Sequence, residues 1–312
     1  MKNKILLALL LCFAMILTGC SNKDKIKTKI KIDEGRGAKD FVVYSPYNSL
    51  NPFGKYLEER GVKREFKKDN AEEIRYLNIN GTSLELSYQS STIDWARYCD
   101  SDCYTLSENE NIKITYYYDA DIVFSFQAVN GASLKSIFPD SGFSFDTEEQ
   151  CKAYSENIAR IVDFDLSKLA CTVTTRIADN DNKYINYDGY YIPGDDEELL
   201  ERTFTWEKEY NDEFSMYAFI VSFAYDSDKN ARVTDVIFPP YPEKIFDISS
   251  DEIKELVLSK YSVYAEIINE PIYCVVCNKL CIAVGVGYGD GTRNEISAAA
   301  DVYVFPSDVT FP

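Results

Sequence analysis

Three cysteines near the C-terminus have the spacing of a metal or redox site. Cys274, Cys277 and Cys281 are separated by two and three residues, as in some zinc and dithiol motifs. The chain holds no His, so a zinc site would need ligands gathered from elsewhere. A redox pair draws its thiolate stability from a helix N-terminus, whereas these residues lie in a β-branched run. We expect either unpaired core cysteines or a disulfide between Cys277 and Cys281 across a three-residue hairpin loop.

A second pair of cysteines brackets three polar residues. Cys99 and Cys103 could close a small disulfide ring in an oxidising exterior. Cys151 lies on the apolar stripe of a helix and is expected to act as a small hydrophobe. Of the 9 cysteines, Cys12 and Cys20 lie near the N-terminus, which leaves seven. Because seven is odd, at least one thiol should stay free or pair between chains.

Acidic loops are the next candidates for chemistry. Residues 179–183 and 226–230 begin like calcium loops, and residues 100–110 form a third acidic stretch. Tyr184 and Ala231 stand where such a loop needs its sharp-turn glycine, and no Glu closes either loop. Solvated turns explain these stretches, although a weak calcium site is a possible partner in so acidic a chain.

The sequence contains none of the common catalytic motifs. Without His there is no Ser-His-Asp or Cys-His arrangement, and no glycine-rich phosphate loop is present. The 51 acidic residues do not single out a carboxylate pair. We therefore predict no catalytic residue, no cofactor and no metal. The formal charge of −18 argues against a nucleic-acid partner.

The N-terminus resembles that of bacterial lipoproteins. Lys2 and Lys4 precede an uncharged apolar run over residues 5–17, which is too short to span a bilayer. Leu17, Thr18, Gly19 and Cys20 then match the lipobox of that class. The resemblance implies a signal peptide over 1–19, a lipid on Cys20, and localisation at the cell membrane facing the extracytoplasmic side.

A basic tether is expected after the anchor, over residues 20–40. Residues 21–32 hold five Lys against Asp24. Removing these and the signal leaves 26 basic and 50 acidic residues on positions 33–312, a net charge of −24. The lysines could rest on anionic lipid head groups. A solvated spacer and an edge strand are the alternatives.

The remaining chain alternates strands with two clear helices. Thr147 with Gln150, and Ser249 with Glu252, predict capping boxes for helices over about 148–162 and 250–261. A weaker helix is expected over 52–59. Aromatic and β-branched runs predict strands, and the pair Asn80 and Gly81 predicts a type I′ hairpin. Tyrosine runs at 116–118 and 190–191 suit either glycan or peptide contact or ordinary strand packing.

These elements indicate an α+β fold with two domains. Hairpins beside isolated helices favour mainly antiparallel sheets, with one amphipathic helix in each domain. The tripeptide Ile-Phe-Pro at 137–139 recurs at 237–239, which suggests a duplicated unit. We place the domains at 41–192 and 193–312.

The sequence leaves three function classes open. The favoured one is a non-catalytic, membrane-anchored binding or sensing module for a wall fragment, a peptide or a partner protein. A carboxylate-dependent cell-wall glycan hydrolase is the first alternative. A structural or assembly lipoprotein without a small ligand is the second.

Overall fold

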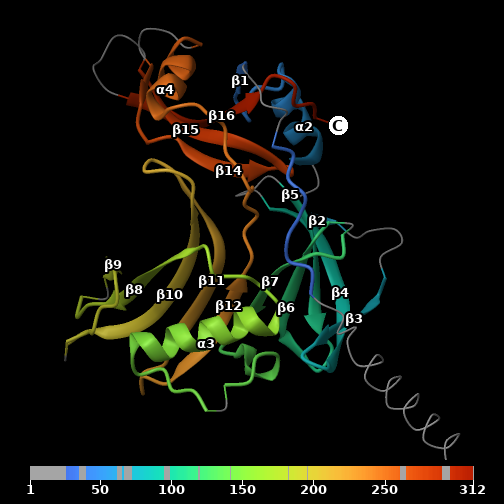
Figure 1. Cartoon of the computed structure of the whole chain (residues 1–312), viewed down its shortest axis with the longest axis vertical. Helices are drawn as coiled ribbons and strands as arrows, with labels where there is room; N and C mark the ends of the chain where they lie inside the picture. The colour runs from blue at the N-terminus through green and yellow to red at the C-terminus, as the bar shows by residue number, and fades with distance from the viewer. Residues whose placement is uncertain are drawn as a thin grey trace, which may run out of the picture.

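The computed structural model describes most of the chain after residue 25. It covers residues 26–34, 40–61, 65–66, 72–94, 99–118, 120–140, 142–181, 183–194, 196–260, 265–289 and 296–311. The described strands form two antiparallel sheets, which we call the large sheet and the small sheet; in the view of Figure 1 the small sheet lies above the large one. The expected α+β class is therefore confirmed.

The large sheet has 11 strands in the described part of the chain. Its order is β2 (Glu65–Phe66), β4 (Thr82–Asp94), β5 (Cys99–Leu106), β6 (Asn109–Tyr117), β7 (Val123–Ala128), β12 (Ala231–Ile237), β11 (Ser215–Tyr225), β10 (Glu198–Glu209), β8 (Ala170–Ala178) and β9 (Tyr184–Asp188), with β3 (Ile74–Ile79) also paired to β4.

Helix α3 (Glu148–Ile161) packs along one face of the large sheet (Figure 1). Cys151, Tyr154 and Ile158 are fully buried on its apolar stripe, and the Tyr154 hydroxyl donates to the Phe138 carbonyl at 2.5 Å. The capping box at Thr147 and Gln150 is present, as predicted. Because the apolar residues recur at helical spacing, the whole stripe faces the sheet.

The small sheet lies between two helices. It is ordered β1 (Phe41–Tyr44), β16 (Ile296–Pro306), β15 (Lys279–Gly289) and β13 (Ala265–Ile267), with β14 (Ile272–Val276) also paired to β15. Helix α4 (Ser250–Leu258) contributes Ile253 and Val257 to the core on one face. Helix α2 (Pro52–Gly61) contributes Phe53 and Leu57 on the other.

Most of the short-range predictions are confirmed, with shifted ends. The capping box at Ser249 and Glu252 is formed, although α4 ends at Leu258 and not at 261. Asn80 and Gly81 have φ values of 49° and 82°, as a type I′ turn between β3 and β4 requires. The expected acidic loop at 100–110 is instead strands β5 and β6 with a turn between them.

The two sheets divide the chain differently from the expected boundary at 192/193. Strands β8 and β10 lie on either side of that boundary and pair with each other in the large sheet. The small sheet combines β1 with the four strands after residue 264. The two expected copies each give one strand to the central pair, β7 and β12. Their helices pack on different sheets, so the duplication stays a hypothesis.

Candidate functional site

The described part of the tether is docked on the protein body. Residues 26–34, which we call the strap, run from the large sheet up to the small sheet (Figure 1). The Val123 amide donates to the Lys27 carbonyl at 2.8 Å on the large sheet. The Asp33 amide donates to the Asn278 carbonyl at 2.8 Å, and the Leu280 amide donates to the Asp33 carbonyl at 3.0 Å. The reading of these residues as a solvated spacer is therefore wrong.

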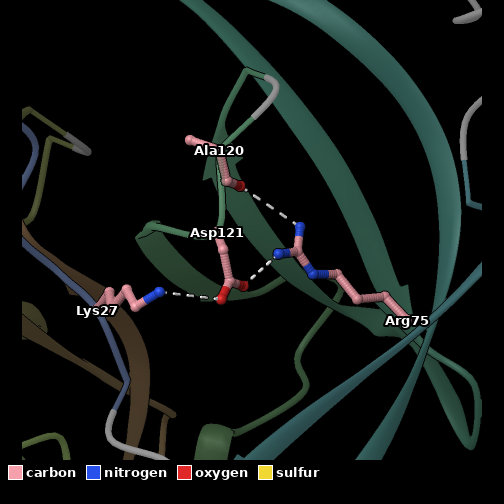
Figure 2. A network of polar contacts seen from close by, with 4 residues as sticks. All are labelled: Lys27, Arg75, Ala120 and Asp121. Carbon is pink, nitrogen blue, oxygen red and sulfur yellow. Dashed lines mark hydrogen bonds and ion pairs between the residues drawn. The ribbon is translucent and has the colours of Figure 1, made fainter.

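Charged groups hold the lower end of the strap. Figure 2 shows Asp121 between Lys27 of the strap and Arg75 of β3. The Lys27 Nζ lies 3.6 Å from the Asp121 carboxylate, and Arg75 also donates to the Ala120 carbonyl at 3.5 Å. The Arg75 guanidinium lies 4.0 Å from the ring centre of Tyr116. Burial raises the pKa of Tyr116 well above its usual range, so that ring stays neutral under the cation.

A second strap lysine, Lys29, also contacts a carboxylate and a tyrosine ring. The Lys29 Nζ lies 4.0 Å from the Glu243 carboxylate and 4.9 Å from the centre of the Tyr241 ring. The Glu34 carboxylate accepts the Glu243 amide at 3.0 Å. The strap and residues 239–243 enclose a hollow of about 230 Å³. Its two carboxylates therefore serve to fix the strap.

An open groove lies where the two sheets meet. The hairpin of β10 and β11 reaches up from the large sheet to β14 of the small sheet (Figure 1). We call the space between them the intersheet groove; its volume is about 340 Å³. It is lined by Glu207, Ser215, Met216, Tyr217, Pro239, Pro240, Ile272, Tyr273, Cys274 and Val275.

The rim of the groove carries exposed apolar side chains. Tyr217 is 57% exposed and Ile272 is 60% exposed, whereas Met216 inside the groove is 8% exposed. Exposed groups of large apolar side chains often mark a surface to which a partner binds. Glu207 is the only carboxylate among the described lining residues. Its two oxygens accept the hydroxyls of Thr172 at 3.2 Å and Ser215 at 2.7 Å.

Strand β14 presents its free backbone edge to this groove. Among the described strands it pairs with β15 alone. Val275 stands opposite Leu280, whose amide donates to Asp33 and not across the hairpin. Hydrogen-bonded and non-hydrogen-bonded pairs alternate along an antiparallel ladder. Val275 and Tyr273 therefore turn their N–H and C=O groups away from β15, along the stretch of β14 that lines the groove.

The cysteines are arranged differently from the prediction. Cys277 and Asn278 form the two-residue turn of the β14–β15 hairpin, with φ values of 52° and 61°. Cys281 therefore stands opposite Cys274 and not opposite Cys277. The Sγ atoms of Cys274 and Cys281 are 3.3 Å apart. The expected three-residue loop is one residue too long, which changes the partner of Cys281.

Cys99 and Cys103 both belong to strand β5. Cα atoms four residues apart in a strand are separated by about 13 Å, roughly twice the span of a disulfide. The side chain of Cys99 lies outside the described residues, and the strand backbone disfavours the predicted ring. Cys151 is fully buried against the large sheet, as expected of a small hydrophobe.

In the acidic loops at 179–183 and 226–230, the first carboxylate accepts hydrogen bonds from backbone amides of its own loop. The Asp226 carboxylate accepts the amides of Asn230 at 2.9 Å and Asp228 at 3.0 Å, and these hydrogen bonds, that from Asn230 above all, lower the pKa of Asp226. The Asp179 carboxylate accepts the amides of Asp181 and Lys183 in the same pattern. Within the described ranges, no group of three His, Cys, Asp or Glu residues is placed to hold a metal ion. A calcium site at these loops therefore has no support.

Sequence reasoning found the cysteines but missed the groove. The groove joins residues 207–217, 239–240 and 272–275, and no single stretch of sequence carries its shape. The available signal was the pair Pro239 and Pro240, together with Tyr217 and Ile272 on outward-facing strand positions.

No helix in the described ranges is both long and apolar enough to cross a membrane. Comparison of the chain with protein-family models, with curated proteins and with solved structures found no match.

Proposed function

We propose that this protein is a membrane-anchored lipoprotein that binds an extended peptide along β14 in the intersheet groove. The observation that carries the proposal is the free edge of β14, where the backbone groups of Tyr273 and Val275 point away from β15 and both residues line an open hollow. An exposed strand edge can take an added strand from a partner, which gains main-chain hydrogen bonds. The groove walls would then contact every second side chain of the bound peptide.

The lining favours a peptide with apolar and basic residues in alternation. Met216, Pro239 and Pro240 offer an apolar wall, while Glu207 offers a negative charge at the rim. The net charge of −24 on residues 33–312 attracts a basic partner from a distance. Both features disfavour an acidic peptide.

The lipobox supports attachment at the membrane surface. Only residues 21–25 separate Cys20 from the strap, and five extended residues span at most about 18 Å. A lipid on Cys20 would hold the body close to the bilayer. The partner would then be a segment that reaches this surface, from the wall or from another surface protein.

The hydrolase alternative is less well supported by the groove. Glycoside hydrolysis needs two carboxyl groups that flank one bond. The described lining residues of the groove include one, Glu207, and both of its oxygens already accept hydroxyls. An assembly lipoprotein without a peptide ligand remains the outcome if the test below fails.

The test uses the soluble chain from Ser21 onward, which keeps every described residue. The probe is a short labelled peptide of alternating lysine and valine, and binding is followed by fluorescence anisotropy. We expect saturable binding that is lost when alternate backbone nitrogens of the peptide are methylated, since methylation removes the donors that a strand needs. A peptide of alternating glutamate and valine should bind more weakly.

Variants locate the binding site. Tyr217→Ser should raise the Kd about fivefold, because it removes a large amphipathic contact, and Glu207→Gln should raise it about threefold. Tyr184→Ser is the matched control, because Tyr184 is 66% exposed on β9. Equal binding by the methylated peptide, or equal losses in Tyr217→Ser and Tyr184→Ser, would refute the proposal.

A further inference from the structure

We propose that Cys274 and Cys281 form a thiol–disulfide exchange site at the intersheet groove, with Cys274 as the sulfur that first attacks an external disulfide. The inference does not depend on peptide binding. It rests on the register of the β14–β15 hairpin, on the distance between the two sulfurs and on their unequal burial.

The backbone already has the geometry that a disulfide needs. Cys274 and Cys281 are direct partners in the antiparallel ladder. Direct partners have Cα atoms about 4.5–5.5 Å apart, inside the range of 4.4–6.8 Å that disulfides span. The sulfurs are 3.3 Å apart. Side-chain rotation alone can therefore bring them to the bonding distance of about 2.05 Å.

The two sulfurs differ in access. Both residues belong to the cluster beneath helix α2, where Cys281 is fully buried and Cys274 packs against it. Cys274 is only half-buried and is also one of the residues that line the groove. Burial, reinforced by Cys274 beside it, raises the pKa of Cys281 well above its usual value. Cys281 is thus a protonated thiol that solvent oxidants do not reach, and it acts as the resolving sulfur.

The exchange needs a small-molecule disulfide, RSSR, as the oxidant. The Cys274 thiolate attacks one sulfur of RSSR, forming a mixed disulfide and releasing RS⁻, which takes up the proton that Cys274 lost. The Cys281 thiol then loses its proton and attacks the Cys274 sulfur. The second RS⁻ leaves and is protonated, so that two protein thiols and RSSR give one protein disulfide and two RSH.

The bond would fasten the outermost strand of the small sheet. Among the described strands β14 pairs with β15 alone, over the five residues from Ile272 to Val276. A covalent link in the middle of this pair prevents β14 from separating, because a cross-link restricts the open state most. The redox state of the pair therefore sets the stability of this edge.

Oxidised glutathione is the probe for the test. The soluble chain from Ser21 onward is reduced, exposed to oxidised glutathione, alkylated and mapped by mass spectrometry. We expect the wild-type chain to lose two hydrogens, to link Cys274 to Cys281 and to keep no glutathione. A link between Cys277 and Cys281, or a chain that leaves both Cys274 and Cys281 reduced, would overturn the proposal.

Single substitutions distinguish the roles of the two sulfurs. Cys281→Ser should trap glutathione on Cys274, roughly tenfold faster than on buried Cys151. Cys274→Ser should leave Cys281 unmodified, and Cys151→Ser should form the same bond as the wild type. Cys281→Ala repeats the trapping experiment if the serine variant fails to fold. Glutathione on Cys281 in the Cys274→Ser variant would contradict the assigned order of attack.

Discussion

Arg202 of β10 is a buried cation without a described carboxylate partner. It is 5% exposed, and its guanidinium lies 3.8 Å from the ring centre of Tyr190. Its terminal nitrogens donate to the Tyr225 hydroxyl at 3.2 Å and to the Tyr191 carbonyl at 3.1 Å. Tyrosine rings and neutral oxygens therefore stabilise a charge that elsewhere in proteins needs an acid.

Arg202→Lys should destabilise the fold although it keeps the charge. Lysine has no planar group to stack on Tyr190 and cannot donate in two fixed directions. We expect a loss of about 1–3 kcal/mol in the free energy of unfolding, measured by urea denaturation. The control is Arg160→Lys on the exposed side of α3, which should change little. Equal stability of the two variants would contradict this account.

The cysteine register shows where prediction at the scale of single residues ends. The β-branched run around Cys274 correctly predicted a hairpin, because strand propensity is local. The partner of Cys281 depends on whether the turn has two or three residues. Positive φ at Cys277 and Asn278 selects the two-residue turn, and cysteine at a turn position gives no sequence signal for it.

At the scale of elements, the strap is the feature with the clearest energetic consequence. Ile26 packs against the core of the large sheet and Ile32 against that of the small sheet. Three backbone hydrogen bonds and three ion pairs also hold the strap. The strap therefore links the two sheets as well as leading to the N-terminus.

Removing residues 26–34 should weaken the whole fold. We expect the free energy of unfolding to fall by about 2–5 kcal/mol, from lost apolar burial and unmet hydrogen bonds. A chain that starts at Ile26 is the control, because it keeps every strap contact and should unfold like the chain from Ser21. Urea denaturation followed by tryptophan fluorescence measures both. Identical midpoints for the strap deletion and the control would show that the strap adds no stability.

The elements that sequence predicted correctly are those with local causes. Both capping boxes join residues three positions apart, so the side chains that start α3 and α4 lie within one short stretch of sequence. The strap was ambiguous because alternating lysine and isoleucine suits a spacer as well as a strand. Its docking depends on Asp121 and Lys279, which lie far along the chain. The groove was missed for the same reason.

For the whole molecule, the absence of His predicts a flat stability profile near neutral pH. At the acid side, hydrogen bonds lower the pKa of the carboxyl groups of Asp165, Asp226 and Glu252. The unfolded chain then binds protons first, so stability is present above about pH 4 and is lost as the pH falls. At the alkaline side, the hydrogen bond to Glu197, helped by burial, raises the pKa of Tyr191 to about 12.

At alkaline pH the free energy of unfolding changes with pH in the opposite direction. Burial also raises the pKa of Tyr154 and Tyr225. Unfolded tyrosine releases its proton near pH 10, so stability is present below about pH 10 and is lost as the pH rises. We expect urea midpoints to be level between about pH 6 and 8 and to fall on both sides. A step in the midpoint within that window would require a titrating group that this account lacks.

The docking of the strap also fixes an order of events in folding. Asp33 meets Lys279, which lies 246 positions further along the chain. Under the proposed attachment at the membrane surface, the chain is exported from its N-terminus, so residues 26–34 emerge early and Lys279 at the start of β15 emerges late. Contacts of such sequence separation form slowly, because a long loop must close first. We therefore expect the strap to close last, so that its docking marks the moment at which both sheets are in place.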